Sequence, residues 1–184
     1  MNIRVLNRSE IENIRNLDRR EIVKQVYYLD NGQLKLKNKF CNIKTWKADE
    51  LERNIEHIYE IYDRRGCILG GFVDDKLIAV SALDSEFFGK NQDYLQLYFL
   101  HVDSRYRGLG FGKQLLKKTI IKAKELGARK LYISATPSQK TINFYFQMGC
   151  ELAAEVNPRL LELEPKDIHL QLPLQRTQKL YSSR

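Results

Sequence analysis

A run of glycines flanked by cations lies between residues 105 and 113. It reads Arg107-Gly108-Leu109-Gly110-Phe111-Gly112, with Arg105 before it and Lys113 after it. The first turn of a helix has backbone N–H groups without internal partners and carries a partial positive charge. Glycine lets such a backbone approach an anion closely, because it lacks Cβ and adopts positive φ at little cost. The segment therefore predicts an anion site, most naturally one for a pyrophosphate.

Two other phosphate motifs fit this segment poorly. A P-loop requires Gly-x-x-x-x-Gly-Lys-Ser/Thr, and a dinucleotide site requires Gly-x-Gly-x-x-Gly within a repeating βαβ unit. Neither pattern occurs between residues 105 and 113. A purely structural interpretation stays open, in which the glycines only shape a tight turn before a helix.

Hydrophobic periodicity predicts the elements that hold this loop. Residues 94–102 form an apolar run typical of a strand, and residues 111–126 place their aliphatic side chains on one helical face. An Asn31-Gly32 pair between two β-rich runs indicates a hairpin. The other expected elements are strands at 3–6, 22–29, 34–37, 67–73, 77–83, 130–134, 150–156 and 168–174, and helices at 10–17, 48–64 and 141–148.

These elements predict an α+β fold. Because several strands follow one another directly along the chain, we expect a mixed, mostly antiparallel central sheet flanked by helices. The length suits one domain over residues 1–184, with the hairpin at about 22–40 as an insertion. Asn7 or Ser9 is the expected cap of the first helix, since Glu12 follows Ser9 three residues later in a capping-box pattern, and Gly66 is the expected stop of the second.

Composition narrows the class of protein. The chain is 43% apolar and 29% charged, as in ordinary globular proteins. It has no apolar run long enough to span a bilayer, and its first residues lack a signal-peptide core, so we expect a cytoplasmic protein with no membrane partner. Cys41, Cys67 and Cys150 are widely spaced, which predicts neither a disulfide framework nor a zinc site.

A second informative segment follows the first along the chain. Residues 138–150 read Ser-Gln-Lys-Thr-Ile-Asn-Phe-Tyr-Phe-Gln-Met-Gly-Cys, which resembles the Asn-x-x-Ala-Ile-x-Phe-Tyr-x-x-x-Gly-Phe segment of the GNAT N-acetyltransferase superfamily. Arg107, Gly110 and Gly112 match motif A of the same family, Gln/Arg-x-x-Gly-x-Gly/Ala. The resemblance extends from about residue 3 to residue 174, and its specific motifs lie between residues 94 and 150.

The resemblance implies binding of acetyl-CoA, with no metal. The amides of residues 107–112 would hold the CoA pyrophosphate, and the end of the preceding strand would pair with the pantetheine arm as an added strand does. One of those strand amides would polarise the thioester carbonyl. The implied cofactor contacts outside the glycine run are Leu100, His101, Val102, Lys113, Ser138 and Asn143.

Tyr145 matches the family tyrosine that lies near the CoA sulfur and often serves as general acid. The alternative is an aromatic side chain packed into the core beside Phe144. Two positions depart from the family pattern. Ser138 stands where asparagine is common, and Gln96 stands where the histone-acetylating branch has a catalytic glutamate. Glutamine takes up no proton, so that base is missing.

The base and the acceptor site are left open by the sequence. An amine must lose a proton before it attacks, and the candidates to take it are Asp84, Glu86, Asp93, Tyr98 and His101. In the family the acceptor pocket is lined near the first helices, which here points to Asp18 and Glu21 as partners of a cationic amine or as solvated surface charge. The hairpin at 22–40 then forms a lid or a dimer edge, so a homodimer stays open.

Three functions are consistent with these patterns. The first is an enzyme that transfers an acetyl group from acetyl-CoA to a primary amine by direct attack. The second is a non-catalytic sensor of acyl-CoA, which the missing glutamate favours and the presence of Tyr145 opposes. The third is nucleic-acid binding, suggested only by the net charge of +8, which suits CoA equally well. No zinc finger, aromatic platform or long basic arm accompanies that charge, so we do not expect it.

Overall fold

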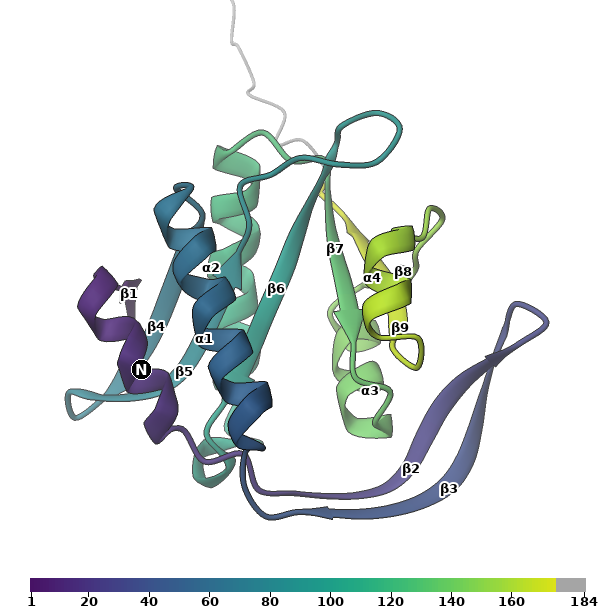
Figure 1. Cartoon of the computed structure of the whole chain (residues 1–184), viewed down its shortest axis with the longest axis horizontal. Coiled ribbons are helices and arrows are strands. Elements are labelled where there is room, and N and C mark those ends of the chain that lie inside the picture. Colours follow the sequence, from purple (N-terminus) through teal and green to yellow (C-terminus); the bar gives the residue numbers. More distant parts are fainter. Residues whose placement is uncertain (175–184) are drawn as a thin grey trace, which may run out of the picture.

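A seven-stranded sheet organises the molecule, which a computed structural model describes over residues 1–174. The last ten residues of the expected 1–184 domain lie outside the described part. The strand order is β1-β4-β5-β6-β7-β9-β8, and Figure 1 shows the helices packed on both faces. The strands are β1 (Asn2–Val5), β4 (Cys67–Val73), β5 (Lys76–Leu83), β6 (Tyr94–Val102), β7 (Lys130–Ala135), β8 (Glu151–Leu152) and β9 (Ile168–Pro173).

Neighbouring strands of this sheet are antiparallel except for β6 and β7, which run parallel. The α+β fold class with a mixed, mostly antiparallel sheet is thus confirmed. The helical segments are η1 (Arg8–Asn16), α1 (Ala48–Asp63), η2 (Ser104–Tyr106), α2 (Phe111–Glu125), α3 (Gln139–Gln147) and α4 (Pro158–Leu163). Within the described residues, no helix has the length and apolar character that crossing a bilayer requires.

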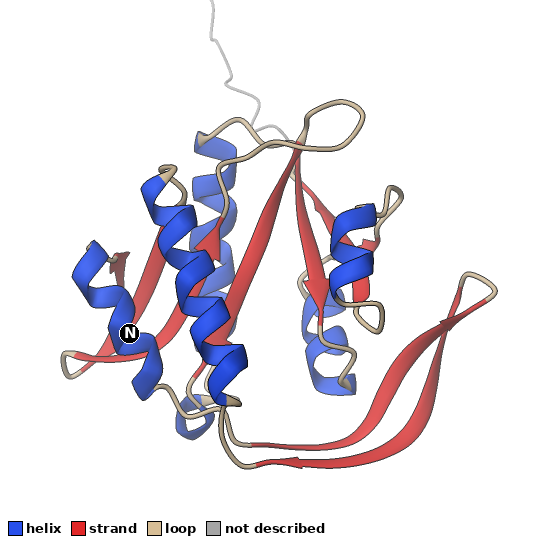
Figure 2. Cartoon of the chain, viewed as in Figure 1, coloured by secondary structure: helices blue, strands red, loops and turns tan. Residues whose placement is uncertain are grey.

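Two main hydrophobic clusters hold the layers together. On one face, η1 and α1 bury isoleucines such as Ile14 and Ile58 against β4 and β5. On the other face, α2 and α3 bury Leu116 and Ile142 against β6, β7 and β9. Figure 2 shows α1 and α4 on the near side of the sheet and α2 and α3 on the far side. Burial of these apolar faces is the main force that fixes the strands in place.

Strands β6 and β7 are joined along only part of their length. Their ladder runs from Tyr94–Lys130 to Gln96–Tyr132 and then stops. A register shift between β5 and β6 falls at the same level, between Ala82 and Leu83, and such a bulge increases the local twist and bend of a strand. Figure 2 shows the two strands close together at one end and far apart at the other. Beyond Gln96, one edge of β6 therefore has no partner strand among residues 1–174.

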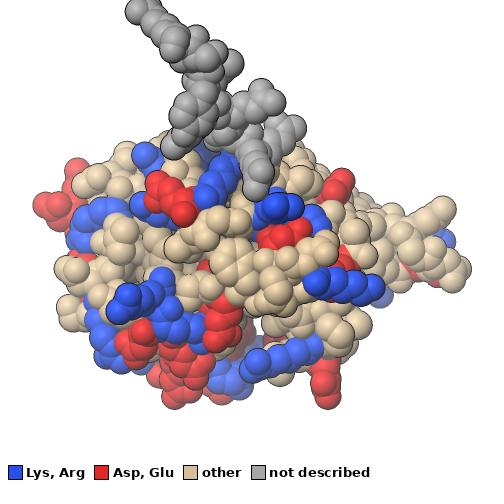
Figure 3. All heavy atoms as spheres, turned by 90° about the horizontal axis from the view of Figure 1, so that it is seen from above, with Lys and Arg blue, Asp and Glu red and all other residues tan. Residues whose placement is uncertain are grey.

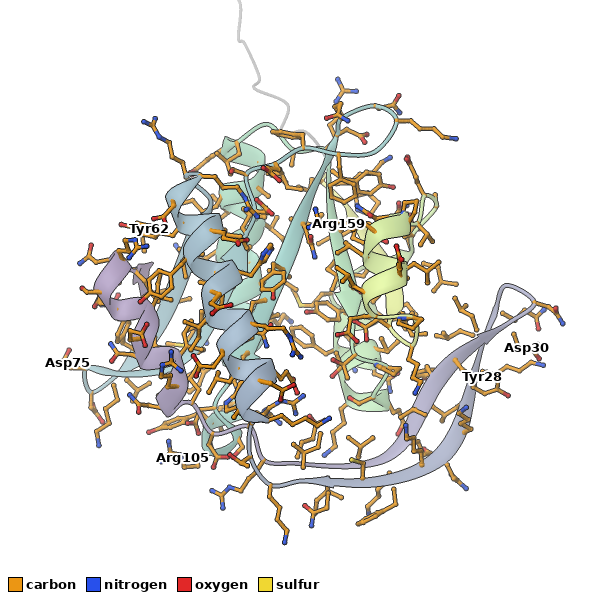
Figure 4. The ribbon with its side chains drawn as sticks, in the orientation of Figure 1. Tyr28, Asp30, Tyr62, Asp75, Arg105 and Arg159 are labelled. Carbon is orange, nitrogen blue, oxygen red and sulfur yellow. The ribbon has the colours of Figure 1, made fainter. Side chains whose placement is uncertain are left out.

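The predicted hairpin is an arm rather than part of the main sheet. It consists of β2 (Glu21–Asp30) and β3 (Gln33–Ile43), with Asn31 and Gly32 at positive φ in the turn. Tyr27 anchors it to α3, because its N–H donates to the Pro137 carbonyl at 2.8 Å and its hydroxyl to Asn143 Oδ1 at 2.9 Å. Figure 4 shows Tyr28 and Asp30 on the distal part of the arm, away from the sheet.

The structure decides or corrects several local expectations. The first helix is a 3₁₀ helix capped by Asn7, one of the two expected candidates, because Asn7 and Glu10 satisfy each other's backbone amides in a capping box. The strand expected over 150–156 covers only Glu151–Leu152. Asn157 caps the unpredicted helix α4, which Pro158 starts. Helix α1 ends before Gly66 as expected, but Arg65 adopts the left-handed conformation.

Candidate active site

The glycine run connects η2 to α2 at the end of the molecule where β6 and β7 have separated. Gly108 and Gly110 have φ of 80° and 82°, and Gly110 is the N-cap of α2. A Cβ added at either position would meet no protein atom within 4 Å. These two glycines are therefore required by backbone conformation, while the space beside them is open. A Cβ at Gly112 would lie 3.5 Å from Val102 Cγ2, in ordinary contact with the end of β6.

The backbone N–H groups of this loop are free to bind a ligand. In the part of the chain that the structure describes, no protein acceptor receives a hydrogen bond from the consecutive amides of Gly108 to Lys113. The first helical bond of α2 is the one from Gln114 N to Gly110 O, at 3.1 Å. Unpartnered donors at a helix N-terminus, together with its partial positive charge, form a site for a phosphate.

The arginines near this loop bind protein groups instead of surrounding its opening. Arg105 holds Asp103 with two hydrogen bonds, of 2.9 and 2.7 Å, and this pairing lowers the pKa of the Asp103 carboxyl to about 2. Arg107 donates to the Val102 carbonyl at 2.9 Å and lies 3.6 Å from Glu21. Lys113 alone of the three cations has no hydrogen-bond or ion-pair partner among residues 1–174.

The unpaired edge of β6 presents peptide groups of alternate residues. Asp103 N donates to Ile78 O on β5, so the peptide groups of His101 also point toward β5 and those of Leu100 and Val102 point to the open side. Of the three predicted strand contacts, Leu100 and Val102 thus present their peptide groups to the open edge. The peptide groups of His101 belong to the β5 ladder instead.

The His101 side chain also faces away from the open edge. Its Nε2 lies 3.2 Å from the Asp18 carbonyl, and its ring packs 4.9 Å from that of Trp46. Burial lowers the pKa of His101 to about 4, so the imidazole is neutral at physiological pH. It serves as a half-buried packing residue with one polar contact.

Tyr145 lies on α3 with its ring inside the hydrophobic cluster of β6, β7 and α2. It is 6% exposed, and its ring centroid lies 5.2 Å from that of Phe144. Its hydroxyl has no hydrogen-bond partner among the described residues. Burial raises the pKa of the Tyr145 phenol above its usual value, so the group keeps its proton at neutral pH.

Comparison with known proteins agrees with this architecture. Residues 32–150 match the model of the acetyltransferase (GNAT) family. The chain belongs to the GNAT family. It is an N-acetyltransferase with acetyl-CoA as its cosubstrate. No curated protein sequence matches the chain significantly.

Solved structures of GNAT acetyltransferases share the fold at low sequence identity. Nourseothricin acetyltransferase is 18% identical, with a TM-score of 0.72 over 95% of this chain and 98% of that one. Aminoglycoside 6'-acetyltransferase type Ii is 15% identical, with a TM-score of 0.66 over 96% and 99% of the two chains. The PaiA N-acetyltransferase of Thermoplasma acidophilum, in complex with coenzyme A, is 16% identical, with a TM-score of 0.60 over 94% and 98%.

In this GNAT chain, an open cavity lies between the arm and the start of α3. Its volume is about 330 Å³, and its lining comes from residues 21–25 of β2 and residues 138–140 at the start of α3. Ser138 caps α3 by accepting from Thr141 N at 3.3 Å, and Asn143 accepts from the Tyr27 hydroxyl at 2.9 Å. Both predicted cofactor contacts on α3 thus already have protein partners, and Ser138 lines the cavity.

The acidic groups suggested by the sequence are engaged or remote. Asp84 is paired with Arg64, at 2.6 Å, and that pairing holds the pKa of the carboxyl below its usual value despite burial. Asp93 lies 3.3 Å from Lys130, next to the first rung of the β6–β7 ladder and therefore at its closed end. Asp18 is paired with Arg20.

The phenol suggested as a base is also engaged. Tyr98 donates to Asn54 Oδ1 at 2.9 Å, and burial raises the pKa of its phenol to about 12. Glu86 is exposed in the connection between β5 and β6, which Figure 1 shows at the closed end of the pair. These groups therefore offer no free base near the glycine run.

Proposed function

We propose that this GNAT enzyme transfers the acetyl group of acetyl-CoA to a primary amine by direct attack of the amine on the thioester. The observation that carries the proposal is the row of unpartnered amides from Gly108 to Lys113 beside the open edge of β6. An anion at the amides and an extended amide chain along the Leu100 peptide groups and the Val102 N–H would satisfy both sets of groups, while the Val102 carbonyl accepts from Arg107. A CoA molecule has both features in one ligand.

Each residue of the site then has a defined role. The amides of the glycine run bind the pyrophosphate, and Lys113 adds positive charge to them. The peptide groups of Leu100 and Val102 orient the pantetheine arm and the thioester carbonyl. Acetyl-CoA supplies the activated acetyl group. Tyr145 holds a proton at its hydroxyl, ready for the departing sulfur, and the low polarity around its ring keeps that proton in place.

Direct attack is favoured over an acyl-enzyme because the cysteines are poor nucleophiles or distant. Burial raises the pKa of the Cys150 thiol to about 12, and it also raises the pKa of Cys67. A nucleophilic cysteine needs a lowered pKa that yields thiolate. Cys41 is exposed on the arm, in β3. We therefore assign no covalent intermediate to this enzyme.

The acceptor we propose is a primary amine on a cationic small molecule. Two of the structurally similar enzymes are a nourseothricin acetyltransferase and an aminoglycoside 6'-acetyltransferase. Figure 3 shows acidic and basic side chains interspersed over the face seen from above, without one sign dominating. A surface of this kind gives less support to a polyanion such as nucleic acid as the partner.

The first experiment is calorimetric titration with acetyl-CoA of three proteins: wild type, Gly110→Glu and Gly127→Glu. Gly127 is a matched control, because it also has positive φ and open space around it but lies at the opposite end of α2. We expect binding by wild type and Gly127→Glu and loss of binding in Gly110→Glu, where a carboxylate meets the pyrophosphate. Equal binding of acetyl-CoA by all three proteins would show that the glycine run does not hold the pyrophosphate.

Turnover is then measured as release of free CoA thiol with a panel of amines: nourseothricin, an aminoglycoside, a polyamine and a peptide N-terminus. Transfer to one of them supports the enzyme. Binding of acetyl-CoA with no transfer to any amine would favour the acyl-CoA sensor instead.

A further inference from the structure

The proposed transfer needs a group that accepts the amine proton. Gln96 cannot be that group, because a glutamine side chain takes up no proton. Gln96 forms the last rung of the β6–β7 ladder, opposite Tyr132. Side chains at one rung of a sheet lie on the same face, and residues two apart along a strand share that face. Tyr132 and Ser134 of β7 therefore lie on the Gln96 face, and Ser134 lies one step farther toward the open part of the strand pair.

Asp167 reaches Ser134 from the neighbouring strand β9. Ile168 pairs with Ala135 in the β7–β9 ladder, so Asp167 lies at the C-terminal end of β7. The Ser134 hydroxyl donates to Asp167 Oδ2 at 3.1 Å. Figure 1 shows the connection from α4 to β9 at that end of β7, close to α3. The carboxylate thus lies at the end of β7 where β6 and β7 have separated, close enough to Tyr145 to act on its phenol, and β7 lies between it and Gln96.

The surroundings of this carboxylate differ from those of the other acidic groups. Among the described residues it has no cationic partner, and the Ser134 hydroxyl is the single side-chain donor to it. The charged or titratable groups that act on it are Glu164 from the end of α4 and Tyr145 from α3. Burial is the main cause that raises the pKa of Asp167 to about 6, with the like charge of Glu164 adding to it and the Ser134 bond opposing it.

We propose that Asp167 is the proton acceptor of the transferase, in the role that Gln96 leaves vacant. The proposal rests on the proposed function. The acceptor ammonium loses one proton to the Asp167 carboxylate, directly or through one water, and becomes a neutral amine. Its lone pair forms the new N–C bond as the C–S bond breaks, and the sulfur takes the proton of Tyr145. The nitrogen of the new amide releases its second proton through water to the Tyr145 phenolate, and Asp167 returns the first proton to solvent.

The first test replaces Asp167 by asparagine, which keeps the shape and accepts the Ser134 hydrogen bond but takes up no proton. A general base contributes roughly 10²–10⁴-fold to rate, so we expect kcat/KM for the amine to fall by about that factor. The affinity for acetyl-CoA, measured by calorimetry, should stay within about twofold, because the glycine run is untouched. A fall in kcat/KM of less than threefold would overturn the proposal.

Two further variants test the assignment through the pH profile. In wild type, kcat/KM should decline below about pH 6, where Asp167 takes up its proton. Glu164→Gln removes the like charge, so the acidic limb should shift to lower pH. Ser134→Ala removes the hydrogen bond to the charged form, so the limb should shift to higher pH. Glu162→Gln is the matched control on the same helix, exposed and without effect expected.

The pKa of Asp167 can also be measured by direct titration, in the absence of turnover. Carboxyl ¹³C NMR of the ligand-free protein should contain an aspartate signal that titrates near pH 6 and is missing from Asp167→Asn. Absence of such a signal from wild type would overturn the proposal. If wild type acetylates no amine, both the proposed function and the role of Asp167 are contradicted. If wild type acetylates an amine and Asp167→Asn does so at the same rate, only the role of Asp167 is contradicted.

Discussion

The guanidinium of Arg107 donates to the carbonyl oxygen of Val102 at 2.9 Å, across the turn that leaves β6. The same side chain lies 3.2 Å from the Arg20 carbonyl and 3.6 Å from the Glu21 carboxylate. One residue of the glycine run thus fastens the end of β6 to the start of the arm. Glutamine is the family alternative at this motif position, and its side-chain amide is also a donor for a carbonyl. The arginine therefore positions the loop.

We expect Arg107→Ala to weaken acetyl-CoA binding without removing a phosphate contact. A hydrogen bond from a charged donor is worth about 1.5–3 kcal/mol, so the Kd should rise about tenfold or more as the loop loses its attachment to β6. Arg107→Gln should restore most of the affinity. Calorimetric titration of the three proteins measures this. Equal weakening by alanine and glutamine would instead indicate that the positive charge itself contacts the ligand.

Tyr145→Phe separates the proposed chemistry of the phenol from its packing. The hydroxyl has no partner among the described residues, so its loss should change the free energy of unfolding by less than about 1 kcal/mol. We expect kcat to fall roughly 10²-fold, with the Kd of acetyl-CoA unchanged. Because the pKa of the phenol is raised, wild-type kcat should not decline until well above pH 10. An unchanged kcat in the variant would leave Tyr145 a packing residue.

The local sequence pattern was sufficient to predict the helices and strands that position the site. The apolar run over residues 94–102 predicted β6 at Tyr94–Val102, and the aliphatic face over residues 111–126 predicted α2 at Phe111–Glu125. The same reasoning identified the anion loop, because its physics is contained in one strand, one turn and one helix. The hairpin was equally readable, since an Asn-Gly turn fixes its own register.

Features that depend on distant partners were not readable. The separation of β6 from β7 follows from where their ladder stops, at Gln96, and no local signal records that. From the sequence, Arg105 and Arg107 were expected as cations beside the anion site. In the fold they bind Asp103 and the Val102 carbonyl. Asp167 was not among the bases that the sequence suggested, because its surroundings depend on Ser134 and on the end of α4. Helix α4 did have a local signal, Asn157 followed by Pro158.

The arm should loosen when its bond to α3 is removed. Tyr27→Phe deletes the hydroxyl that donates to Asn143 at 2.9 Å, at a cost of about 1 kcal/mol. We expect faster hydrogen exchange at the amides of β2 and a weaker Kd for acetyl-CoA, since the cavity between β2 and α3 loses one wall. Tyr28→Phe is the matched control, because that ring packs under Lys37 on the arm itself. The same exchange rates in both variants would contradict the anchoring role.

The side chains of His101 and Asp167 should make the free energy of unfolding depend on pH in opposite directions. His101 has a folded pKa of about 4, below the ordinary histidine value of 6.5, so the unfolded chain binds more protons between those pH values. Its contribution to the free energy of unfolding is therefore complete above pH 6.5 and falls, by at most about 1.4 kcal/mol per pH unit, as pH drops toward 4. Asp167 has a folded pKa of about 6, above 3.8, so its contribution rises over nearly the same interval.

Replacing one of the two residues should leave only the pH dependence of the free energy of unfolding that the other residue causes. Relative to wild type, His101→Gln should become progressively more stable as pH falls from 6.5 to 4, because an uncharged residue replaces one that resists protonation. Asp167→Asn should become progressively less stable over pH 6 to 4, because wild type gains there by binding a proton and the variant does not. Urea unfolding at half-unit pH steps measures both differences. Parallel curves for either variant and wild type would mean that the replaced group titrates alike in folded and unfolded chains.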